Sequence, residues 1–284
     1  MKRWLAAIAL CCLGGDFPRS LNAPAGHTPV IDGLLSPGEW DDAERFSGPK
    51  DWISQFSPTT NPKDLSFTGF IKHDDTSLYL ALDVIDDVLY GIDTPRWLPD
   101  ENPKAHDLTR EGWPWFGDEM ELLIHAGPPW KGDESAAGNG FSWQMVLNLT
   151  KSRLGGIGKG GLLEGEPRSD PRAFETYRRW IETGAMRGAA RPKPGGHGYI
   201  MEWAVRFNPC LEVEPGRFYS PAMGDRPVGL NIAVGDLDTK ETGTGNFGHF
   251  HHEEWFAGAK DVRTQLRYWG TLWIRNSPLA RAQR

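Results

Sequence analysis

The stretch Ser77-Leu78-Tyr79-Leu80-Ala81-Leu82-Asp83-Val84 decides the fold class of this 284-residue chain. Its three leucines and its valine stand at every second position, which is the period of a β-strand with one buried face. The pattern recurs farther along, where Met201, Trp203 and Val205 share one face and polar residues occupy the other. Both segments are typical of half-buried strands in an antiparallel sheet.

Six further segments carry the same strand signal. They are residues 66–72, 120–125, 142–149, 180–186, 228–234 and 268–274. Glycine occurs 34 times and proline 22 times, so the chain turns often and helices are few. We therefore expect an all-β fold, an antiparallel β-sandwich with long loops and at most one or two short helices. One helix is predicted at residues 171–179, after the N-cap residue Asp170. The predicted core includes Leu80, Leu82, Leu122, Ile124, Trp203 and Ile232.

The first residues have the layout of a secretory signal. Lys2 and Arg3 precede an apolar run over residues 4–13, which two glycines then interrupt. We expect residues 1–25 to be a signal peptide or a lipoprotein leader, the latter because Cys11 and Cys12 lie in this segment. Residues 26–275 then form a single sandwich, and residues 276–284 form a C-terminal tail. This division predicts a protein that is secreted, periplasmic or lipid-anchored at the cell surface.

Charge and hydropathy argue against two classes of partner. Lysine and arginine total 31 against 38 aspartate and glutamate residues, and the net charge of −7 disfavours binding to a nucleic-acid backbone. No apolar run reaches the roughly 18 residues that a transmembrane span needs. Cys210 is the only cysteine outside the predicted leader, and its apolar surroundings predict a small buried side chain rather than a nucleophile.

A dense group of metal-ligand residue types occurs near the C-terminus. His249, His251 and His252 are followed directly by two glutamates, and imidazoles with carboxylates bind zinc and other divalent ions. The spacing differs from the HExxH motif of helical zinc hydrolases. A polar loop with solvated histidines explains the same residues, so a metal site here is one of two interpretations.

Aspartate pairs end two of the predicted strands. The pairs are Asp86 with Asp87 and Asp236 with Asp238, while Asp118 and Glu121 flank a third strand. Carboxylates at strand ends bind calcium, and paired carboxylates also carry out glycoside hydrolysis. Aspartate is also a common turn residue. We favour turn or calcium-binding roles for these pairs.

Several segments, taken in order, resemble family 9 carbohydrate-binding modules. Pro29-Val30-Ile31-Asp32-Gly33 with Trp40 is similar to the family's VIDG…W opening. Further matches follow at residues 73–87, at Trp115-Phe116-Gly117-Asp118-Glu119-Met120-Glu121, at residues 198–205 and at residues 229–238. Trp269-Gly270-Thr271-Leu272 resembles the closing fGtL. The ordered set covers residues 29–274.

The resemblance implies a sandwich that binds sugar without cleaving it and that holds structural calcium. Trp115 matches the first of two stacking tryptophans, and Trp255 is the best match to the second. Glu121 falls where the family has a polar contact to sugar hydroxyls, and Gln144 lies on the next matched strand. Physical chemistry agrees, because an indole covers the apolar face of a pyranose while carboxylates and amides bind its hydroxyls.

The sequence thus predicts a secreted or periplasmic, non-catalytic carbohydrate-binding protein that supports polysaccharide breakdown. Its predicted partner is an oligo- or polysaccharide, and its predicted cofactor is structural Ca²⁺. Two alternatives stay open. One is an enzyme, either a glycoside hydrolase or a metal-dependent hydrolase that uses the loop at residues 249–254. The other is a haem-binding protein of the same superfold.

Overall fold

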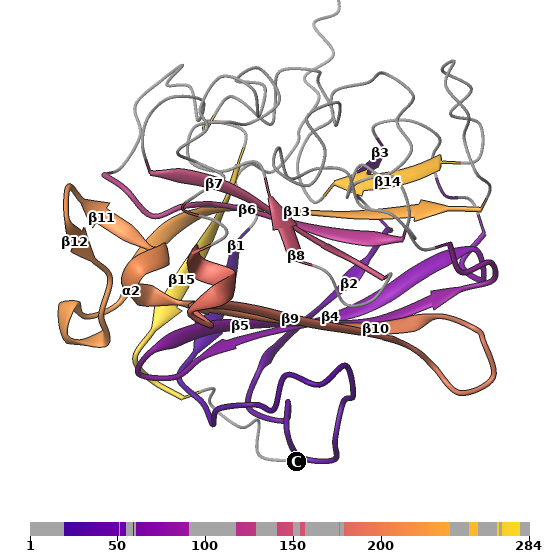
Figure 1. The fold of residues 1–284 in the computed structure, drawn as a ribbon, viewed down its shortest axis with the longest axis horizontal. Coiled ribbons are helices and arrows are strands. Elements are labelled where there is room, and N and C mark those ends of the chain that lie inside the picture. Colours follow the sequence, from indigo (N-terminus) through magenta and orange to yellow (C-terminus); the bar gives the residue numbers. More distant parts are fainter. Residues whose placement is uncertain are drawn as a thin grey trace, which may run out of the picture.

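The computed structural model describes residues 20–50, 52–54, 59, 61–90, 118–128, 141–149, 154–156, 176, 179–238, 250–254, 266 and 269–278. In this part of the chain the strands form two sheets that face each other (Figure 1). A hairpin of β11 (Glu212–Glu214) and β12 (Arg217–Phe218) extends from one end. The predicted all-β sandwich is confirmed.

Among the described residues, the first sheet has eight strands. They are β1 (Ser20–Pro24), β3 (Ile53–Ser54), β6 (Glu119–His125), β7 (Ser142–Asn148), β8 (Leu154–Gly156), β13 (Arg226–Leu237), β14 (Phe250–Glu254) and β15 (Gly270–Arg275). The order is β1-β15-β13-β6-β7-β8, and β14 pairs with both β13 and β3. Strand β13 pairs with β15 through residues 226–230 and with β14 through residues 233–237. Its other edge pairs with β6.

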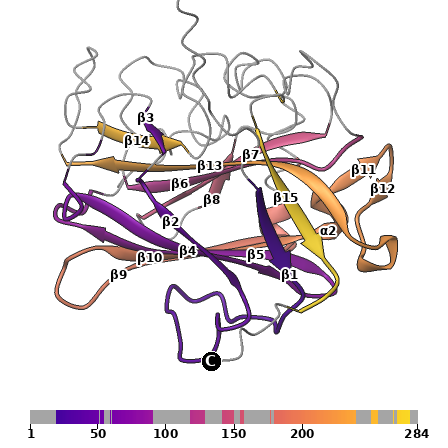
Figure 2. The same cartoon turned by 180° about the vertical axis from the view of Figure 1, so that it is seen from behind.

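The second sheet has five strands in the described part of the chain, in the order β2-β4-β5-β10-β9. They are β2 (Glu44–Gly48), β4 (Leu65–His73), β5 (Ser77–Asp86), β9 (Met186–Pro192) and β10 (Tyr199–Arg206). All neighbours are antiparallel. Figure 2, the view from behind, shows β4, β5 and β10 lying beneath β6 and β13 of the first sheet.

The apolar core lies between the two sheets. It contains all six residues that the sequence predicts there, each at most 1% exposed: Leu80, Leu82, Leu122, Ile124, Trp203 and Ile232. A smaller apolar cluster, which includes Trp40, Phe70 and Tyr79, covers the outer face of the second sheet. Cys210 is buried in the main core, and burial raises the pKa of its thiol, as expected for a structural cysteine.

Helical structure in the described chain is confined to short segments. These are α2 (Phe207–Cys210), the 3-10 turn η2 (Pro221–Met223), residues 179–182, and single residues at 176 and 266. Most of the helix predicted at residues 171–179 lies outside the described residues. Within them, no helix is both long enough and apolar enough to cross a membrane.

The strand predicted at residues 180–186 is wrong. The N–H of Thr183 donates to the Arg179 carbonyl over 3.0 Å, and the N–H of Gly184 donates to the Ile181 carbonyl over 3.0 Å. These are helical hydrogen bonds, and Gly184, with a φ of 67°, ends the turn. Strand β9 begins only at Met186.

Strand β1 lies within the segment that the sequence assigns to the leader. It pairs with β15, with Leu21 opposite Leu272 and Ala23 opposite Ile274. Leu21 is 6% exposed and Ala23 is completely buried. In the structure, residues 20–24 extend the first sheet and contribute Leu21 and Ala23 to the core, while the predicted leader stays a prediction. The β1–β15 pair is also parallel, unlike the predicted antiparallel pairing.

Candidate functional site

Two polar side chains meet on the outward face of the first sheet. Glu121 in β6 and Gln144 in β7 lie on the face opposite the core, because their neighbours Leu122 and Met145 point inward. The Gln144 amide nitrogen Nε2 donates to Glu121 Oε2 over 2.7 Å. Both side chains are completely buried. The structure thus brings together the two polar residues predicted to contact sugar.

Strand register aligns this pair with the end of β14. Glu121 stands opposite Ala233 of β13, and Ala233 stands opposite Glu254 of β14. Neighbouring strands lie about 4.8 Å apart, so the backbones at Glu121 and Glu254 are about 10 Å apart. Trp255 follows Glu254 in the sequence, and Trp115 precedes β6. Both predicted stacking tryptophans lie outside the described residues.

The histidine-rich segment is a strand rather than the predicted loop over residues 250–254. As strand β14 it continues along the edge of β13 beyond the last residue that pairs with β15, so it satisfies backbone groups that would otherwise stay open. His251 stands opposite Asp236 in this register, and His252 stands opposite Gly235. His249 lies outside the described residues, and the metal site built on these histidines stays a prediction.

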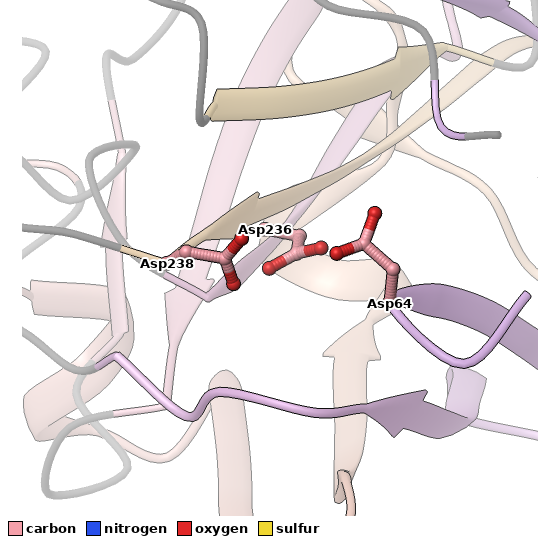
Figure 3. Close-up of side chains that lie close together, drawn as sticks. All are labelled: Asp64, Asp236 and Asp238. Carbon is pink, nitrogen blue, oxygen red and sulfur yellow. The ribbon is translucent and has the colours of Figure 1, made fainter. Parts of the chain in front are cut away.

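Carboxylates from both sheets converge at one end of the sandwich. Four of them are the predicted calcium ligands: Asp86 and Asp87 at the end of β5, and Asp236 and Asp238 at the end of β13. Asp64, just before β4, and Asp118, just before β6, join them. Three overlapping trios each have ligand oxygens within 4.8 Å of one another: Asp64, Asp236 and Asp238; Asp86, Asp87 and Asp238; Asp86, Asp118 and Asp236. We call these six residues the acidic cluster. Figure 3 shows Asp64, Asp236 and Asp238 with their carboxylates gathered together.

Some oxygens of the acidic cluster lack a hydrogen-bond donor. Both carboxylate oxygens of Asp236 and the Oδ2 of Asp86 are buried, and within the described residues they accept no hydrogen bond. Asp118 differs, because it accepts hydrogen bonds from the backbone N–H groups of Tyr90, over 2.6 Å, and Leu237, over 3.3 Å. Buried carboxylates without donors are costly unless a positive charge lies beside them.

Burial and repulsion between carboxylates raise the pKa values in this cluster. Burial raises the pKa of Asp86 to about 7 and that of Asp236 to about 9, and neighbouring carboxylates act in the same direction. The pKa of Asp118 is likewise raised well above its usual value, first by burial and then by Asp86 and Asp236. A bound cation would favour the ionised forms and reverse these shifts.

The donor set of the acidic cluster fits calcium. Ca²⁺ prefers carboxylate oxygens, and the cluster offers them from four separate chain segments, with unpartnered oxygens on Asp236 and Asp86. Asp64 is absent from the predicted ligands, because it is a single aspartate in a turn and only folding brings it beside Asp236. Asp118 was predicted only as a residue that flanks a strand.

Two buried histidines are held by protein atoms. The ring nitrogens of His73 lie 2.7 Å from the carbonyl oxygen of Asp74 and 2.7 Å from that of Arg275. Those of His125 lie 2.9 Å from Ser142 Oγ and 3.1 Å from the carbonyl oxygen of Pro128. These contacts indicate structural roles, so neither histidine supports the haem-binding alternative.

Solved structures share this arrangement of strands. A family 9 carbohydrate-binding module from Caldicellulosiruptor kristjanssonii in complex with glucose matches 94% of this chain and 98% of its own length, with 13% identity and a TM-score of 0.57. A family 9 module from the same organism in complex with cellotriose matches the same shares, with 14% identity and a TM-score of 0.56. The fold is that of a family 9 carbohydrate-binding module. No family model matches the sequence, and no curated protein matches it. The resemblance inferred from sequence motifs is confirmed at the level of the fold.

Proposed function

We propose that the protein binds carbohydrate and does not cleave it. The observation that carries the proposal is the fold: 94% of the chain matches a module that was solved with glucose. The Glu121–Gln144 pair adds support, because it lies on a sheet face where the sequence resemblance places the sugar contact. Glucose and cellotriose, the sugars in the two similar structures, are therefore the first ligands to test.

In this proposal Trp115 and Trp255 stack on the sugar, and Glu121 with Gln144 forms the polar part of the site. The hydrogen bond from Gln144 fixes the orientation of the Glu121 carboxylate. Because both side chains are completely buried, Glu121 contacts a sugar hydroxyl directly only if the surface over it opens on binding. If that surface stays closed, the Glu121–Gln144 pair supports the sheet beneath the stacked sugar without contacting it.

Calorimetric titration of glucose and cellotriose into wild-type, Trp115→Ala and Trp255→Ala proteins tests the stacking. Each loss of a stacking indole should weaken binding by about fivefold or more, since such contacts contribute ~1 kcal/mol. Trp273→Ala is the matched control, because Trp273 is a half-exposed indole on β15, outside the proposed site, with the Arg275 guanidinium 4.3 Å from its ring centroid. Wild-type affinity in both Trp115→Ala and Trp255→Ala would overturn the assignment of these tryptophans.

Incubation with cellotriose tests the absence of catalysis. A binding protein returns the trisaccharide intact, whereas a glycoside hydrolase releases glucose or cellobiose. Chromatography of the reaction mixture, with and without added Zn²⁺, covers both hydrolase alternatives. Release of shorter sugars at a rate abolished by substitution of His251 and His252 would establish the metal-dependent alternative instead.

We also propose that the acidic cluster binds structural Ca²⁺ through Asp86, Asp118, Asp236 and Asp238, with Asp64 and Asp87 close by. Bound calcium supplies the positive charge that the buried carboxylates lack. Calorimetric titration of CaCl₂ into chelator-treated protein should detect a site that Asp236→Asn loses. Asp41→Asn is the control, because Asp41 is 69% exposed and lies outside the cluster. Equal Ca²⁺ affinity in Asp236→Asn and wild type would remove the cluster as the site.

Export is the third part of the proposal. The charged and apolar start of the sequence supports a signal peptide or a lipoprotein leader, and β1 supports a leader that ends before Ser20 rather than at residue 25. A secreted, periplasmic or lipid-anchored protein of this kind would support polysaccharide breakdown outside the cytoplasm. Mass spectrometry of the exported protein should find an N-terminus at or before Ser20. A mature chain that starts after Pro24 would contradict this boundary.

A further inference from the structure

A second candidate binding site lies on the outer face of the second sheet, which points away from Glu121. A groove of about 640 Å³ opens there. Its floor includes Tyr79, Ala204, Arg187 and Arg206, from β5, β10 and β9. The turn at residues 74–76 borders one side, and the turn at residues 183–184 borders the other.

Strand register fixes the two arginines on one face. Ala204 stands opposite Tyr79 on one side and opposite Arg187 on the other, so these three residues form a row across the sheet. Arg206 is two residues farther along β10 and therefore points to the same face. The small side chain of Ala204 separates Arg187 from Tyr79 and keeps the middle of the floor low.

The two guanidinium groups are available to a ligand. Arg187 and Arg206 are both exposed, and neither forms an ion pair or a side-chain hydrogen bond with the described residues. Two neighbouring guanidinium groups present several N–H donors to one planar anion. Arginine binds carboxylates through two parallel hydrogen bonds, which gives strength and orientation. The basic side of the groove thus suits a carboxylate.

The opposite side of the groove contains two carboxylates, one held by hydrogen bonds within the protein and one exposed to solvent. Asp74 accepts hydrogen bonds from Thr28 Oγ1 over 2.5 Å, Tyr79 Oη over 2.6 Å and the backbone N–H of Thr76 over 2.7 Å. These contacts hold Thr28 and Tyr79 in place and leave Asp74 little capacity for a ligand. Asp75, by contrast, is exposed on the same turn and offers acceptors for hydroxyl groups.

We propose that this groove binds an acidic sugar, with the uronate carboxylate on Arg187 and Arg206 and the ring hydroxyls toward Asp75. The choice of a sugar rather than another carboxylate rests on the proposed carbohydrate-binding function. Glucuronate and glucose form the natural pair of probes, because they share a ring and hydroxyls and differ only in the carboxylate at C6. The site lies apart from the Glu121 face, so both ligands bind at once.

Calorimetry with glucuronate tests the proposal. We expect wild type to bind glucuronate in the presence of saturating cellotriose, and the Arg187→Gln/Arg206→Gln protein to bind it at least about tenfold more weakly, since hydrogen bonds to charged groups contribute ~1.5–3 kcal/mol. Binding should also weaken as NaCl concentration rises. Arg191→Gln is the matched control, because Arg191 is exposed on the same face of β9 but does not line the groove. Its affinity for glucuronate should equal that of wild type.

The outcomes separate this proposal from the proposed function. Cellotriose binding with no glucuronate binding, or with equal glucuronate affinity in Arg187→Gln/Arg206→Gln and wild type, overturns the groove alone. Displacement of glucuronate by cellotriose also overturns it, because both sugars then compete for one site. Retained cellotriose affinity in the double variant, together with lost glucuronate affinity, supports both sites. Failure of both sugars to bind overturns both proposals.

Discussion

Asp74 and Asp236 show how the surroundings decide what a buried or half-buried carboxylate can do. Burial alone would raise the pKa of Asp74, but hydrogen bonds from Thr28, Tyr79 and Thr76 outweigh it and lower the pKa to about 2. At Asp236 burial raises the pKa to about 9, because no donor offsets it and neighbouring carboxylates add repulsion. The Asp74 carboxylate is therefore satisfied by hydrogen bonds within the protein, while the Asp236 carboxylate supports the proposal of a bound cation.

Asp74→Asn should lower the melting temperature at neutral pH, and the difference from wild type should shrink in acid. The folded pKa of about 2 lies below the ordinary value of about 3.9, so the ionised carboxylate stabilises the fold above about pH 4. This contribution is lost as the pH falls toward 2. Thermal melts of both proteins from about pH 6 to about pH 2.5 check this, with Asp75→Asn as the exposed neighbouring control. A difference that does not change with pH would contradict it.

Glu121→Gln separates direct sugar contact from a positioning role. If the carboxylate touches the sugar, the variant should bind cellotriose roughly tenfold more weakly, because a charge-assisted hydrogen bond is lost. Gln144→Glu is the companion variant. It replaces the amide that donates to Glu121 with a second carboxylate, and repulsion between the two carboxylates should lower stability. Calorimetry and thermal melts distinguish lost affinity from lost folding. Unchanged cellotriose affinity in Glu121→Gln would mean that the Glu121–Gln144 pair is structural and does not contact the sugar.

At the residue scale, the structure places the residues predicted to contact sugar on strands, while the sugar contact itself stays a prediction. Glu121 and Gln144, which the family resemblance indicated, lie on the regular strands β6 and β7. Strand patterns in the sequence placed Asp86 and Asp236 at strand ends. Asp64 could not be found this way, because nothing local distinguishes it from other turn aspartates. Its place in the cluster depends on folding, which brings the turn before β4 beside Asp236 and Asp238 at the end of β13, a contact between distant segments.

At the scale of elements, the predictable strands are those with a clear buried face. Strands β4, β5, β6, β7, β10, β13 and β15 alternate or are continuously apolar, and the sequence located them all. Strand β9, with sequence MRGAARP, and β14, with FHHEE, carry little such signal. Their positions follow from β10 and β13, because the backbone N–H and carbonyl groups along the edges of these strands need a neighbouring strand to pair with. Single-sequence patterns do not reveal such partners.

Strand β1 allows a test of the proposed boundary before Ser20. A chain that starts at Ser20 should be as stable as the full chain, whereas a chain that starts at Gly26 loses β1. The shorter chain exposes the edge of β15 and leaves cavities where Leu21 and Ala23 are buried. We expect it to lose about 3 kcal/mol or more of unfolding free energy in urea. Equal midpoints for the two chains would show that β1 contributes nothing to the fold.

At the scale of the whole molecule, the acidic cluster connects the two sheets. Asp86 belongs to β5 of the second sheet and Asp236 to β13 of the first, and Asp118 directly precedes β6 of the first. Asp118 directly precedes β6 and lies three residues before Glu121, so we expect a cation held there to order the proposed sugar face as well. The groove lies at the other end of β5, roughly 25 Å from the cluster, given ~3.3 Å per strand residue.

Removal of calcium should therefore affect the two proposed binding sites unequally. With excess EDTA we expect a lower melting temperature, because the folded state then loses the free energy of calcium binding. Cellotriose affinity should fall by about threefold or more, since β6 and β13 support Glu121 and end in cluster carboxylates. Glucuronate affinity at Arg187 and Arg206 should change by less than about twofold, because these residues contact neither strand.

Calorimetry of both sugars in CaCl₂ and in EDTA makes the comparison, and restoration by added CaCl₂ excludes irreversible damage. An equal loss for both ligands would mean that calcium controls the fold as a whole, and no loss for either would mean that the cluster does not support the sugar face.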